Sequence, residues 1–97
     1  MDLSDFQALI EKMYSHKDRL RGSAGTFLWF SEEVGELAAA IGEGSREEKE
    51  GEFADVLAWL ATLANVEGIS LAQAVQAKYG DGCPGCGKFV CTCNEKP

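Results

Sequence analysis

Serine starts and glycine stops divide the first 80 residues of this chain into segments of helical length. A serine followed three positions later by Gln or Glu is typical of a helix start, because each side chain can satisfy a free backbone amide of the other residue. That spacing opens three segments, at Ser4, Ser45 and Ser70. Glycine, which often ends a helix, follows the later segments. The pattern predicts helices over residues 4–17, 26–42, 46–67 and 70–79.

Apolar residues recur at helical spacing inside these segments. Phe27, Val34 and Ile41 form one such stripe, and the following segment carries a similar one. No run alternates apolar and polar residues as a strand would, so the sequence predicts an all-α fold, a small four-helix bundle over residues 1–80. At 97 residues the chain makes one domain with a thin core, which favours self-association.

The charge balance excludes several classes of partner. The chain carries 16 acidic and 9 basic residues, a net charge of −7, whereas a nucleic-acid backbone selects a basic surface. No apolar run approaches the ~20 residues of a membrane-spanning helix. The start of the chain lacks the basic and apolar regions of a secretory signal. We therefore expect a cytoplasmic protein without nucleic-acid or membrane partners.

Five carboxylates are placed so that two neighbouring helices would aim them into one space. Glu32, Glu33 and Glu36 lie within an arc of about 100° on one predicted helix, opposite its apolar stripe. Glu52 and Asp55 are neighbours at i and i+3 on the next helix. Removing these five leaves 11 acidic residues against 9 basic ones, so most of the net charge lies in this set.

Packed like charges are unfavourable unless a cation neutralises them, and Mg²⁺ or Mn²⁺ is the natural partner of carboxylate oxygens. Acidic helix faces are more often simply solvated. Here, however, both tryptophans, Trp29 and Trp59, project among the acids rather than into the apolar stripes. A large ring on such a face favours a pocket or a subunit interface.

Two acidic motifs read Glu33-Val34-Gly35-Glu36-Leu37-Ala38 and Glu52-Phe53-Ala54-Asp55-Val56-Leu57. Together they resemble the signature of the MazG-like nucleotide pyrophosphohydrolases, within the all-α nucleoside-triphosphate pyrophosphohydrolase superfamily. Residues 68–78 resemble the family's last helix, so the resemblance covers most of the chain, from about residue 5 to 79.

The resemblance implies Mg²⁺-dependent hydrolysis of a nucleoside triphosphate between the α- and β-phosphates, with a monophosphate and pyrophosphate as products. It also implies a homodimer or a tetramer. Carried onto this chain, it makes Glu33, Glu36, Glu52 and Asp55 the metal ligands. Glu32 and Glu33 become the catalytic carboxylates, with Glu32 either a further ligand or the acceptor of a proton from the attacking water.

The resemblance also implies substrate contacts. Lys78 matches a family lysine that contacts phosphate, and Trp59 falls where relatives place a ring near the base, with Trp29 beside it on the acidic face. Relatives follow that lysine with an Asn and an Arg-Tyr pair, which are missing here. The basic segment 17–21, and Arg21 in particular, is the expected substitute for phosphate contact.

A cysteine-rich tail, residues 81–97, follows the predicted bundle. Cys83, Cys86, Cys91 and Cys93 form a C-x-x-C and a C-x-C pair, which offer four thiolates to a tetrahedral Zn²⁺. In a reducing compartment, metal binding is favoured over disulfides. Such a zinc would be structural, because four cysteines leave no open position for water. Free thiols and disulfides remain the alternatives.

Two other functions compete with nucleotide hydrolysis. One is a non-catalytic helical interaction module whose zinc knuckle binds a partner, with the acidic set retired from catalysis. A retired site is expected to lose at least one carboxylate, and all five are present. The other is an enzyme similar to phosphoribosyl-ATP pyrophosphohydrolase, which the sequence does not distinguish.

Overall fold

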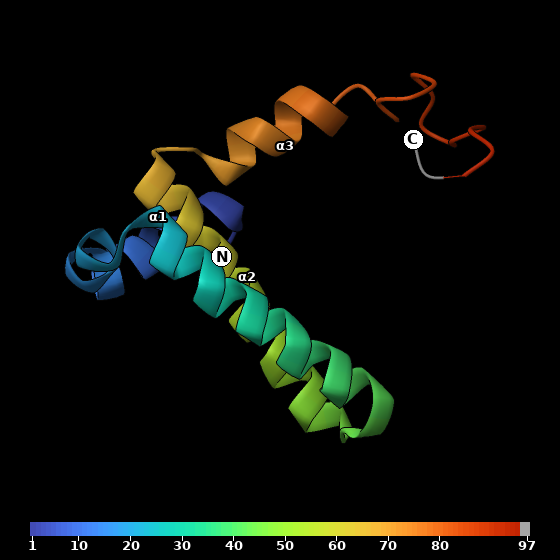
Figure 1. Ribbon diagram of the computed structural model, residues 1–97. Helices are drawn as coiled ribbons and strands as arrows, with labels where there is room; N and C mark the ends of the chain where they lie inside the picture. The colour runs from blue at the N-terminus through green and yellow to red at the C-terminus, as the bar shows by residue number, and fades with distance from the viewer. Residues whose placement is uncertain (96–97) are drawn as a thin grey trace.

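The computed structural model describes residues 1–95 (Figure 1), and three helices form where the sequence carries its helix signals. They are α1 (Leu3–Glu43), α2 (Arg46–Glu67) and α3 (Leu71–Tyr79). No strand occurs in the described range, so the all-α prediction is confirmed. Ser45 caps α2 in a capping box with Glu48, and Ser70 caps α3 by accepting from the backbone N–H of Gln73. Gly68 ends α2 in the left-handed conformation.

The structure has three helices rather than the four predicted, because the first two predicted segments are joined in α1, where two helical stretches meet at a kink. Residues 18–25, expected to be a loop, continue α1, and only Gly22 leaves helical geometry, with φ 75° and ψ 177°. A positive φ costs glycine little, so this one residue holds the kink at which the two helical stretches of α1 meet. The start also differs: Asp2 caps α1, in a reciprocal capping box with Asp5, and Ser4 does not.

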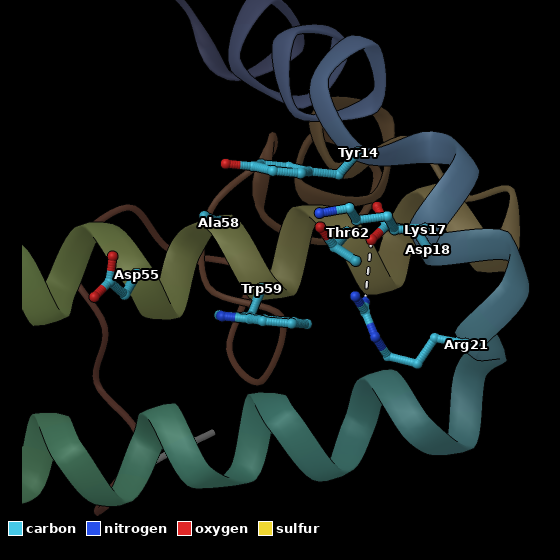
Figure 2. A pocket seen from close by; sticks show the side chains of 8 residues that line it. All are labelled: Tyr14, Lys17, Asp18, Arg21, Asp55, Ala58, Trp59 and Thr62. Carbon is cyan, nitrogen blue, oxygen red and sulfur yellow. Dashed lines mark hydrogen bonds and ion pairs between the residues drawn. The ribbon is translucent and has the colours of Figure 1, made fainter.

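Gly22 divides α1 into a first arm, residues 3–21, and a second arm, residues 23–43. In the view of Figure 2, α2 lies between the two arms. The short turn at Gly44 and Ser45 returns the chain directly, so that α2 packs along the second arm. Helix α3 projects away from this pair and leads into the tail (Figure 1).

One side chain joins the first arm to the turn before α3. The Gln7 amide nitrogen donates to Asn65 Oδ1 at 2.9 Å and to the Ile69 carbonyl at 2.7 Å. Its amide oxygen accepts from the backbone N–H of Leu71 at 2.8 Å. Asn65 in turn donates to the Gln7 carbonyl at 3.2 Å. This network holds the α2–α3 turn against the start of the chain.

The apolar stripes predicted from the sequence are largely exposed in the single chain. Phe27, Val34 and Ile41 on the second arm are 53%, 42% and 55% exposed. On α2, three large apolar residues are exposed as well, namely Phe53, Leu57 and Leu60. Apart from Ile10, the buried residues of the helices are small or polar, namely Ala40, Ala61, Ala64, Asp18, Thr26 and Thr62. The second arm and α2 therefore meet through faces other than their apolar stripes.

Membrane crossing by one helix is not indicated. Within residues 1–95, no single helix combines the required length with a sufficiently apolar composition. Only α2 and α3 taken together reach both, and they are bent by 97° at their junction.

Candidate functional site

Three carboxylates from two helices meet between the second arm of α1 and α2. Glu33 and Glu36 lie one turn apart on α1, and Glu52 faces them from α2. A carboxylate oxygen from each lies within 4.8 Å of those of the other two. The residue that α1 buries beside this cluster is the small Ala40, which lines the same cavity as Glu36 and Glu52.

The carboxylates of this three-acid cluster are poorly satisfied by the protein. Within residues 1–95, the Oε2 atoms of Glu33 and Glu52 are buried without a hydrogen-bond partner. Burial, followed by a hydrogen bond with Glu36 and the negative charges around it, raises the pKa of Glu33 to about 7. Burial and the charges of Glu36 and Asp55 also raise the pKa of Glu52. A hard divalent cation fits this donor set, because it would supply the partner that these oxygens lack.

Asp55 lies where two cavities meet. The first cavity, of about 520 Å³, is an open cleft that Asp55 lines together with Glu36, Glu52 and Glu48. The second, of about 300 Å³, lies between α2 and the first arm of α1 and is also lined by Asp55. A ligand that reaches from one cavity into the other would therefore pass the Asp55 carboxylate.

The second cavity combines cationic and aromatic side chains (Figure 2). Its lining residues are Tyr14, Lys17, Asp18, Arg21, Asp55, Ala58, Trp59 and Thr62. The guanidinium carbon of Arg21 lies 4.9 Å from the centroid of the Trp59 ring. Trp59 also stacks on Trp29, with centroids 6.2 Å apart and planes inclined by 20°. This arrangement offers an aromatic surface beside positive charge, which suits a planar, anionic ligand.

A buried ion pair fixes Arg21 in this cavity. Asp18 is 2% exposed, and its Oδ1 accepts from Arg21 Nη1 at 3.1 Å (Figure 2). Its Oδ2 is buried with no hydrogen-bond partner among residues 1–95. Sequence reasoning missed Asp18 and Tyr14. The i, i+3 spacing of Asp18 and Arg21 could have indicated an ion pair on one face of a helix. That spacing is informative only within a helix, and residues 18–25 were expected to be a loop.

The structure brings most of the predicted site residues together, with two exceptions. Glu36, Glu52 and Asp55 line the open cleft, and Glu33 joins Glu36 and Glu52 in the three-acid cluster. Trp29, Trp59 and Arg21 form the neighbouring aromatic and cationic group. Glu32 is exposed and stands outside the three-acid cluster. Lys78 lies on α3, lines neither of these cavities in the described chain, and places its Nζ 5.7 Å from the ring of its neighbour Tyr79.

The four cysteines of the tail form a second cluster, apart from the carboxylates. The sulfur atoms of Cys83, Cys86, Cys91 and Cys93 all lie within 4.8 Å of one another, and all four are free thiols. Hydrogen bonds with the backbone of Thr92 and Lys88 lower the pKa of the Cys86 thiol to about 6.

Comparison with known proteins gives one family. The model of the MazG nucleotide pyrophosphohydrolase domain matches residues 21–85, about two-thirds of the chain. The matched range contains the three-acid cluster, Asp55 and the stacked tryptophans. It also begins at Arg21, the cation of the second cavity. None of the curated proteins compared with the chain matches it.

Proposed function

The chain belongs to the MazG nucleotide pyrophosphohydrolase family, and on that premise we propose that it hydrolyses a nucleoside triphosphate between the α- and β-phosphates. Water adds across this anhydride bond, and the products are a nucleoside monophosphate and pyrophosphate. The supporting observation is the junction at Asp55, where a cleft of carboxylates adjoins a cavity that holds a cation and an aromatic ring. The two halves match the two needs of such a substrate, cation-mediated phosphate binding and base stacking.

The carboxylate cleft is the proposed site of Mg²⁺ or Mn²⁺. Glu33, Glu36 and Glu52 would hold the cation, with Asp55 as the fourth ligand. Support comes from the buried oxygens of Glu33 and Glu52, which have no hydrogen-bond partner among residues 1–95, and from the closeness of three like charges. Once bound, the cation would offset the negative charge of the triphosphate.

We assign the proton-accepting role to Glu32. Its carboxylate is exposed, and it is adjacent in sequence to Glu33 of the three-acid cluster. A carboxylate that is not engaged by the cation remains free to take a proton from the attacking water. Glu33, by contrast, belongs to the three-acid cluster and acts by binding and positioning.

The aromatic and cationic cavity is the proposed site of the nucleoside and its phosphates. Trp59, supported from behind by Trp29, offers a stacking surface to the base. Arg21, oriented by Asp18, is the proposed phosphate contact, and Lys17 lines the same cavity. Lys78 as a phosphate contact stays a prediction, since it lies on α3 and lines neither cavity in the described chain.

We also propose that the chain acts as a homodimer or tetramer. The exposed stripe of Phe27, Val34 and Ile41, with its counterpart on α2, is an apolar surface larger than scattered single residues would make. A second copy of the chain would cover it. A cytoplasmic location likewise stays a prediction.

Activity is tested with a panel of ribo- and deoxynucleoside triphosphates and phosphoribosyl-ATP, with Mg²⁺ present and pyrophosphate as the measured product. Glu36→Gln and Asp55→Asn should each reduce turnover by at least about 100-fold while helicity is retained. Glu47→Gln, an exposed carboxylate outside the cleft, is the matched control. Orthophosphate as the product would reject the cleavage position. Full activity in both variants would reject the site, and no turnover with any substrate would favour the interaction module.

A further inference from the structure

The four tail cysteines are spaced as ligands of one metal ion rather than as disulfide partners. Cys83 Sγ lies 3.6 Å from Cys91 Sγ and 3.9 Å from Cys93 Sγ. Two thiolates bound to Zn²⁺ at about 2.3 Å with tetrahedral angles lie about 3.8 Å apart. A disulfide would bring two sulfurs to about 2.05 Å. The observed separations fit the tetrahedral value, and Cys86 completes the set of four within 4.8 Å.

The backbone of the tail is folded around this centre. The Cys83 N–H donates to the Lys88 carbonyl at 2.8 Å, and the Gly87 N–H donates to the Cys83 carbonyl at 2.7 Å, which closes a tight turn. Gly82 and Gly87 support the turn with φ of 109° and 76°. A side chain on Gly82 would also meet the Lys88 carbonyl group at 3.1 Å.

Backbone amides point at the sulfur atoms as well. The Gly85 N–H donates to Cys83 Sγ at 3.4 Å, and the Cys93 N–H donates to Cys91 Sγ at 3.3 Å. Such contacts stabilise sulfur in its negatively charged form, which is the form that binds metal. Both chelating pairs, C-x-x-C and C-x-C, thus receive an amide hydrogen bond of their own.

The described tail has little else to hold it in this shape. Its largest apolar side chains, Phe89 and Val90, are 84% and 83% exposed, so they form no core. A short segment without a core needs a cross-link or a metal to fold. The family match stops at residue 85, so three of the four cysteines lie beyond the pattern shared with the pyrophosphohydrolase domain.

We propose that Cys83, Cys86, Cys91 and Cys93 bind one structural Zn²⁺ ion, which folds the tail into a knuckle. The site is closed, because four thiolates complete the tetrahedron and leave no position for water or substrate. It shares no residue with the carboxylate cleft, and its proposal does not depend on the proposed hydrolysis.

The experiment measures metal in the full-length protein, purified under reducing conditions, without and with one equivalent of added Zn²⁺. We expect about one zinc per chain, four thiols protected from alkylation, and release of zinc on thiol modification. Cys86→Ser and Cys93→Ser should each weaken zinc binding by at least about 100-fold, with bundle helicity unchanged. Co²⁺ in place of Zn²⁺ should give the intense visible absorption of a tetrahedral thiolate site.

Glu36→Gln is the matched control, because it alters the other metal-ligand cluster and should retain the tail zinc in full. Zinc that persists in both cysteine variants but is lost from Glu36→Gln would move the metal to the carboxylates and overturn the proposal. A protein that binds no zinc and keeps four reactive thiols would overturn it as well, as would two disulfides in a sample isolated in parallel without reductant. Should the cysteine variants fail to fold, thiol protection and the Co²⁺ spectrum of the unaltered chain decide the matter.

Discussion

Replacing Glu33 by Gln should stabilise the metal-free protein at neutral and higher pH. The pKa of Glu33 is raised from 4.5 to about 7, first by burial and then by Glu36 and the other carboxylates. Each pKa unit corresponds to about 1.4 kcal/mol, so full ionisation of this group in the folded state costs at most about 3 to 4 kcal/mol. Glu33 is only half-buried, and solvent screening reduces the expected gain to about 1 kcal/mol.

The sign of the pH dependence follows from the direction of this shift. A carboxyl with a higher pKa in the folded state favours folding while it is protonated. For Glu33 this contribution is complete below pH 4.5 and is lost as the pH rises through about 7. The advantage of Glu33→Gln is therefore absent near pH 4.5, grows between pH 4.5 and 7, and stays constant above.

The assay is urea unfolding in the presence of a chelator, at pH 5 and pH 8, for wild type and variant. Subtracting the stability at pH 5 from the stability at pH 8, for wild type and for variant, removes the contributions of ionisable groups that the substitution does not affect. Glu32→Gln, the adjacent exposed carboxylate outside the three-acid cluster, is the control and should show a much smaller effect. With Mg²⁺ the order should reverse, because the wild type gains more from the cation. A variant less stable than wild type at pH 8 without metal, or equally altered at both pH values, would refute the reasoning.

Three further predictions concern the scaffold, the substrate cavity and the assembly. Gln7→Ala should lower the free energy of unfolding, measured by denaturation, by about 1–3 kcal/mol, because its partners at the α2–α3 turn lose their hydrogen bonds. Gln73 is exposed on α3, so the control variant Gln73→Ala should have little effect in the same assay. Arg21→Ala should raise KM for the triphosphate by about 10-fold, and it should destabilise the fold by about 2 kcal/mol because the buried Asp18 loses its ion-pair partner. Arg19 is highly exposed, so Arg19→Ala should leave KM and stability unchanged. Light scattering should give a dimeric or tetrameric mass that Val34→Glu lowers, and a monomeric wild type at micromolar concentration would contradict the assembly.

Local signals in the sequence predicted those parts of the fold that local interactions determine. Helix α2 spans the predicted residues 46–67, because a serine capping box begins it and a left-handed glycine ends it. The same regular spacing predicted that Glu33 and Glu36 would face Glu52. Such features depend on residues three or four positions apart, which the sequence displays directly.

Features that depend on tertiary packing were out of reach. Nothing local showed that residues 18–25 would stay helical around Gly22, since a glycine there reads equally well as a loop. The burial of Asp18 arises from α2, more than 35 positions away, and so does the cavity that it shares with Trp59. The exposure of the apolar stripes was hidden for the same reason, because periodicity identifies an apolar face without saying what covers it.

The second arm of α1 and α2 hold carboxylates between them and leave apolar stripes on the outside. This arrangement connects the stability of the helix pair to its chemistry. The interhelical face carries Glu33, Glu36 and Glu52, which repel each other, while Phe27 and Val34 remain exposed. Burial of a large apolar side chain contributes about 1.5–3 kcal/mol to stability. The side chains of the exposed stripes do not make this contribution, which would be a substantial part of the stabilisation that a chain of this size needs. Two additions would restore it: a cation between the carboxylates and a second copy on the stripes. Each would stabilise the pair of helices that carries the site, so metal binding and assembly should reinforce each other through the same scaffold.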